Sequence, residues 1–126
     1  MSRSASLLAA LAALTGAAGV ALGAAAAHLP GGGDFSRLGA IYLTVHASAA
    51  LAIACFARLA YFHRIILFFG FVLVLGAALF AGDLAHHDFL TGALFPYAAP
   101  TGGTAMIVAW VVLALAFLME SMRHNP

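Results

Sequence analysis

Four long apolar stretches follow one another along the chain, and short segments between them hold nearly every charged residue. A helix needs about 20 mostly apolar residues to cross the hydrocarbon core of a bilayer. The pattern therefore predicts four transmembrane helices, over about residues 5–27, 37–60, 65–87 and 101–123. The longest connection is expected over about residues 88–100, where prolines and glycines interrupt the apolar pattern.

Composition supports a membrane protein. The chain is 65% hydrophobic and 7% charged, whereas soluble domains carry about a quarter charged residues. We expect residues 1–126 to form one all-α domain, an integral membrane bundle of four transmembrane helices. A net charge of +1 without a basic cluster argues against nucleic-acid binding.

The first stretch has some features of a secretory signal peptide, since Arg3 precedes an apolar run that ends in alanines. The run is longer than the apolar region of a signal peptide, which spans about 7–15 residues. We therefore interpret it as a retained first transmembrane helix.

The arginines predict an orientation. Four helices place both termini on one side, and four of the five arginines fall there: Arg3, Arg58, Arg64 and Arg123. Arg37 alone falls on the other side. Because arginine and lysine in short loops favour the cytoplasmic side, we expect cytoplasmic termini and a multi-pass protein of the bacterial inner membrane.

Small residues are expected at the helix contacts, because helices in lipid associate through close packing. The glycines predicted to make these contacts are Gly16, Gly19, Gly23, Gly70 and Gly76. They either hold the bundle together or form a face that docks another subunit. Cys55, inside the second stretch, is interpreted as a small buried residue.

One histidine falls near the middle of a predicted span. A neutral imidazole in lipid needs a hydrogen-bond partner, and Thr15 or Tyr42 lies at a suitable depth for His46. A structural histidine, an axial ligand of a tetrapyrrole, and a proton relay or substrate contact are the alternatives.

A second polar group lies on the predicted periplasmic side and comprises His28, Asp83, His86 and His87. If the third helix continues through His87, Asp83 and His87 share one face. Imidazoles with a carboxylate suit zinc or copper(II). The alternatives are an ordinary solvated or partner-facing loop and a pH-sensitive contact.

Conventional catalysis has no support in the sequence. We find no Ser-His-Asp arrangement and no phosphate-binding glycine loop beside a basic residue. Glu120 and Arg123, three residues apart, are interpreted as a surface ion pair. The chain is not expected to be an enzyme.

Several short motifs together resemble one family. They are Gly23–His28, Tyr42–Ala47, Leu79–Leu84 and Ala99–Gly103 followed by Trp110. Their order and spacing resemble the small membrane proteins grouped as domain of unknown function 423, which include the transmembrane protein 256 type. The matching positions are His28, Tyr42, His46, Gly82, Pro100, Gly102, Gly103 and Trp110.

The resemblance implies a four-helix inner-membrane protein and no established activity. The chain departs from the family at Asp83 and at His86-His87-Asp88, where it adds polar groups. Our leading hypothesis is a non-enzymatic accessory subunit of a larger, energy-transducing membrane complex. It has no cofactor, although bound lipid is compatible with it. The alternatives are a protein that binds zinc, copper or a tetrapyrrole, and a small oligomeric transporter.

Overall fold

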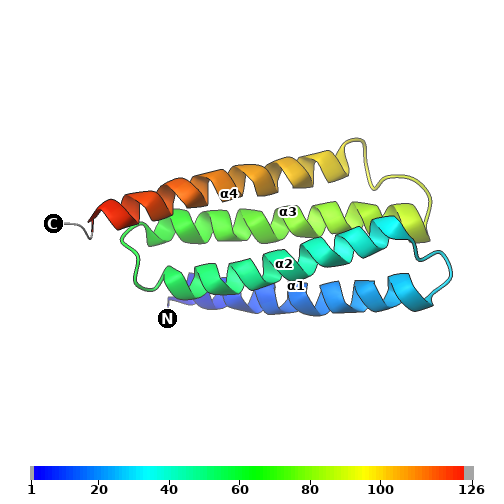
Figure 1. Ribbon diagram of the computed structural model, residues 1–126, viewed down its shortest axis with the longest axis horizontal. Coiled ribbons are helices and arrows are strands. Elements are labelled where there is room, and N and C mark those ends of the chain that lie inside the picture. Colours follow the sequence, from blue (N-terminus) through cyan, green and yellow to red (C-terminus); the bar gives the residue numbers. More distant parts are fainter. Residues whose placement is uncertain (1, 124–126) are drawn as a thin grey trace.

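The computed structural model describes residues 2–123, which form four helices. These are α1 (Arg3–His28), α2 (Asp34–Phe56), α3 (His63–Phe89) and α4 (Ala98–Arg123). Each is long and apolar enough to cross a membrane. The helices run antiparallel to their sequence neighbours, so both ends of the chain lie at the same end of the bundle (Figure 1). The prediction of an all-α fold with four apolar helices is confirmed.

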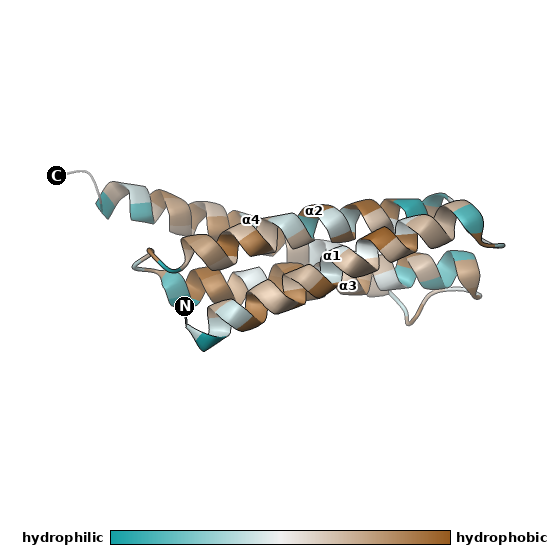
Figure 2. Cartoon of the chain, turned by 90° about the horizontal axis from the view of Figure 1, so that it is seen from below, coloured by the Kyte–Doolittle hydropathy of each residue, from teal (hydrophilic) through white to brown (hydrophobic). Residues whose placement is uncertain are grey.

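Hydrophobic residues dominate the middle of every helix and hydrophilic ones gather at the two ends (Figure 2). The third helix organises the packing, because α3 contacts α1, α2 and α4. In addition α1 packs along α2, whereas within residues 2–123 the backbone of α4 approaches α3 alone. Leu8, Ile66, Leu73 and Leu113 are fully buried in the core between the helices.

Some helix boundaries differ from those expected. The second helix covers Asp34–Phe56 rather than 37–60, and the fourth begins at Ala98 rather than 101. Pro100 was expected to lie in the loop, but it occupies the first turn of α4. Amides of a first turn have no partner within their own helix, so a proline there removes no helical hydrogen bond.

The five glycines expected at helix contacts all face another helix. A Cβ atom at Gly19 would lie 2.7 Å from Thr44 Cγ2. Gly16 and Gly23 face Ala47 and Ala40 of α2 in the same way. Gly70 faces Leu8 of α1 and Ile53 of α2, and Gly76 faces Gly102 and Met106 of α4. These glycines are therefore committed to contacts within the bundle.

The interpretation of Cys55 as a buried residue is wrong, because its side chain is exposed on α2. The buried positions around it are Ile53, Ala54 and Ala57. Cys55 lies on the opposite face of the helix, which points away from α1 and α3.

The contact between α3 and α4 depends on Gly102. A Cβ there would come within 2.6 Å of the Gly76 carbonyl oxygen and 2.7 Å of the Phe80 nitrogen. We expect Gly102→Ala to lower the free energy of unfolding by about 1–3 kcal/mol, since backbone atoms cannot move aside cheaply. Unfolding of the purified protein by sodium dodecyl sulfate in mixed micelles measures this loss.

Gly103→Ala is the matched control. A Cβ at Gly103 would meet only Phe80 Cδ2, at 3.9 Å. In this variant the free energy of unfolding should stay unchanged or rise by up to about 1 kcal/mol, because alanine has the higher helix propensity. Equal losses in the two variants would contradict the role assigned to Gly102.

Candidate functional site

A side-chain hydrogen bond joins α2 to α4 in the middle of the bundle. The Trp110 indole donates from Nε1 to His46 Nε2 over 3.2 Å. The other ring nitrogen, Nδ1, lies 2.7 Å from the Tyr42 carbonyl oxygen. Because an indole N–H can only donate, Nε2 accepts, and the imidazole proton is on Nδ1. The pattern is that of a neutral histidine with both nitrogens bonded.

Aromatic rings surround this connection. The Tyr42 ring stacks on His46 with centroids 5.6 Å apart and an angle of 11° between the planes. It also contacts the Phe80 ring, at 4.7 Å. A cavity of about 320 Å³ opens beside these rings. Its lining comprises Tyr42, His46, Phe80, Gly103, Met106, Ile107 and Trp110.

A larger apolar groove lies between α2 and α4. Its volume is about 530 Å³, and its lining comprises Ala49, Ala52, Ile53, Phe56, Trp110 and Phe117. The Phe56 and Phe117 rings meet edge to face across the seam, 4.9 Å apart. No charged side chain is part of this lining, so the groove suits a hydrocarbon chain rather than a polar substrate.

Sequence reasoning placed His46 correctly in a helix interior, but it missed the principal partner. Thr15 bonds the Leu11 carbonyl of its own helix instead. Tyr42 contributes its carbonyl oxygen, and Trp110 had not been considered. Axial ligation of a tetrapyrrole by His46 Nε2 would require the indole to leave, because that nitrogen's lone pair already accepts its hydrogen bond.

Two carboxylates accept backbone hydrogen bonds at the end of the bundle where α3 connects to α4. Asp83 is 6% exposed. It accepts hydrogen bonds from the Leu94 nitrogen, at 2.7 Å, and from the Ala99 nitrogen in the first turn of α4, at 3.2 Å. Asp88 accepts from the Ser36 nitrogen, at 2.7 Å, and from the Ser36 hydroxyl, at 2.6 Å, at the start of α2.

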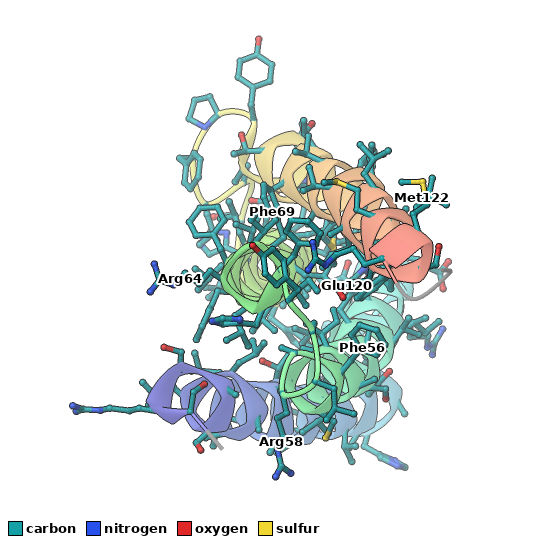
Figure 3. The ribbon with its side chains drawn as sticks, turned by 90° about the vertical axis from the view of Figure 1, so that its left-hand side faces the viewer. Phe56, Arg58, Arg64, Phe69, Glu120 and Met122 are labelled. Carbon is teal, nitrogen blue, oxygen red and sulfur yellow. The ribbon has the colours of Figure 1, made fainter. Side chains whose placement is uncertain are left out.

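A carboxylate also caps a helix at the opposite end of the bundle. Glu120 is 4% exposed and accepts a hydrogen bond from the Phe62 nitrogen, 2.6 Å away, at the start of α3. Figure 3 shows its side chain directed inward, while Met122 points outward. The predicted surface ion pair is therefore wrong. Arg123 instead places its guanidinium 3.7 Å from the centroid of the Tyr61 ring.

Three carboxylates thus bind the N-termini of helices other than their own. The first amides of a helix have no internal partner and carry partial positive charge, so a carboxylate that accepts from them satisfies them and is itself stabilised. Asp34 differs, because it is exposed and pairs with Arg37 at 3.2 Å. The sequence signal for the caps was the position of each acidic residue near a helix end.

The four residues of the predicted metal site do not come together. Within residues 2–123, no group of three or more His, Cys, Asp or Glu side chains is placed to hold a metal ion. His86 Nδ1 donates to the Gly92 carbonyl at 2.7 Å. The His87 ring lies 5.2 Å from that of Phe35, and Asp83 is engaged as described. His28 ends α1 and is exposed.

Comparisons with family models, with curated proteins and with solved structures found no match to this chain.

The cap made by Asp83 can be tested by Asp83→Asn. An amide offers one acceptor oxygen, so one of the two backbone donors would face an NH₂ group. We expect the free energy of unfolding to fall by about 1–3 kcal/mol and hydrogen exchange to accelerate at Leu94 and Ala99. Asp34→Asn, an exposed control, should leave both unchanged. Unaltered exchange in Asp83→Asn would contradict the cap.

The bond between His46 and Trp110 has a direct spectroscopic signature, because the chain contains one tryptophan. In ¹H–¹⁵N spectra, His46→Leu should shift the single indole resonance upfield in the proton dimension, as expected when a donor loses its acceptor. Tyr42→Phe is the control, since His46 bonds the backbone carbonyl of residue 42. An indole resonance insensitive to His46→Leu would refute the bond.

Proposed function

We propose that this protein is a non-enzymatic accessory subunit of a larger complex in the bacterial inner membrane, with cytoplasmic termini. Energy-transducing complexes are the hosts we favour. The observation that carries the proposal is the outer surface of α1, which is shaped for contact with another helix.

The outer face of α1 consists of small residues that recur every three or four positions, and all are exposed: Ser6, Ala10, Ala13, Ala17, Ala21 and Ala24. This spacing places them on one side of the helix, opposite the buried Leu8, Ala12 and Gly19. Small side chains let a neighbouring helix approach closely, which is the main source of helix association in lipid.

The outer face of α4 is different. Exposed residues of α4 include Ile107, Val111, Leu115 and Leu118, which are bulky and suit contact with lipid tails. Because the glycines of α1 are used against α2, its alanine face is the part of that helix open to a partner.

The polar groups also favour a structural role. Asp83, Asp88 and Glu120 cap helices, and His46 is bonded through both nitrogens. The connections over residues 29–33, 57–62 and 90–97 are too short to hold a separate domain. The arginine asymmetry supports cytoplasmic termini, and the motifs described above support membership of the domain of unknown function 423 family.

A bulky substitution on the alanine face tests the proposal. The full-length protein, Ala17→Phe and Val111→Phe are each expressed in the native host, solubilised in mild detergent and separated by native electrophoresis. We expect the wild type and Val111→Phe to migrate with the subunits of one large complex. Ala17→Phe should migrate alone, because a phenylalanine blocks close approach of the partner helix.

Val111 is the matched control because it is equally open to lipid but lies on α4, at 55% exposure. Migration of the wild-type protein alone would sink the proposal. Retention of Ala17→Phe in the complex would contradict the assignment of the alanine face as the interface.

A further inference from the structure

A pocket of about 400 Å³ lies at the end of the bundle that holds both termini. It opens where the start of α1, the end of α2 and the start of α3 meet, and Ser2, Ala57, Arg58, His63 and Leu67 line it. We propose that this pocket binds a phosphate group, carried either by an anionic lipid headgroup or by a small soluble phosphate. The proposal goes beyond the accessory role and does not depend on it.

Charge is the first argument. Arg58 and His63 belong to the lining of the pocket, and no carboxylate does. Within residues 2–123, Glu120 is the only acidic residue at this end, and it is buried against Phe62. Figure 3 shows the Arg58 and Arg64 side chains both extending outward, from the end of α2 and from the start of α3. The lining therefore has one permanently cationic residue, Arg58, and no competing acidic group.

Two helix N-termini add to this charge. Ser2 is the N-cap of α1, and its hydroxyl accepts from the Ala5 nitrogen at 3.2 Å. His63 is the first residue of α3. Both helices direct the positive ends of their dipoles toward this part of the molecule, while α2, whose C-cap is Ala57, directs its negative end there. The Ser2 hydroxyl can also donate to a phosphate oxygen while it accepts from Ala5.

The floor of the pocket is apolar. Ala57 and Leu67 are 4% and 6% exposed, while Ser2, Arg58 and His63 are exposed at the rim. A polar rim over an apolar floor suits an amphiphile better than a simple ion. The pocket also lies at the ends of three spans, at the depth where lipid headgroups begin. Basic pockets between helix ends are typical binding sites of anionic headgroups.

The experiment is native mass spectrometry of the delipidated full-length protein, titrated with phosphatidylglycerol or phosphatidylcholine of identical chains. We expect phosphatidylglycerol to bind about fivefold more tightly, since a nearby arginine contributes about that factor toward an anionic lipid. Arg58→Gln should abolish the preference, and His63→Gln should reduce it. Arg64→Gln, which removes the same charge from a neighbouring position outside the pocket, should change it by less than about twofold.

A second titration with glycerol 3-phosphate distinguishes the sources. Binding of the soluble phosphate that depends on Arg58, without preference between the lipids, would assign the pocket to a soluble ligand. Preference for phosphatidylglycerol without binding of glycerol 3-phosphate would assign it to a headgroup. Equal binding of the lipids with no binding of the soluble phosphate would overturn the proposal. An effect of Arg64→Gln as large as that of Arg58→Gln would also overturn it.

Discussion

Backbone amides at the ends of helices have no partner within their own helix, and in lipid there is no water to supply one. In this chain that constraint explains where the acidic side chains lie. Asp83, Asp88 and Glu120 each reach the N-terminus of a different helix. Each cap also joins two helices, so the same hydrogen bonds that satisfy the backbone fix how the helices are aligned along their axes. The apolar core packs between helices whose ends are held together by these hydrogen bonds.

The sequence was sufficient for the four spans, because a long apolar run is a local property. The sequence was insufficient to predict which carboxylate caps which helix, because the partners lie far apart in the chain. Ser36 pairs with Asp88, and Phe62 pairs with Glu120. Asp83 was interpreted as a possible metal ligand for the same reason. The sequence shows that Asp83 is close to His86 and His87. It does not show that the backbone nitrogens of Leu94 and Ala99 donate to Asp83, because that depends on the conformation of the loop after α3. The start of α4 was misplaced because a proline is compatible with a first turn.

For His46, too, the local features were predictable from the sequence and the distant partner was not. Its depth within a span was predicted, and so was its need for a partner. Trp110 could not be identified, because the backbone of α4 approaches α3 alone, and α4 reaches α2 through long side chains such as the Trp110 indole and the Phe117 ring. The result is a bundle whose middle holds one neutral polar pair and whose ends hold the charges. The small outer face of α1 and the basic pocket at its start are on the same helix, so the proposed contacts with a partner and with phosphate would involve one element.

The caps have a consequence for biogenesis. A ribosome delivers the helices in order, from the N-terminus onward, yet each interhelical cap of α2 and α3 comes from a segment made later. The start of α2 is capped by Asp88, near the end of α3. The start of α3 is capped by Glu120, near the end of α4. The start of α1, by contrast, is capped by its own Ser2. In a nascent chain the start of α3 therefore lacks its carboxylate partner until the last turn of α4 has been synthesised, so this cap forms only when α4 is complete.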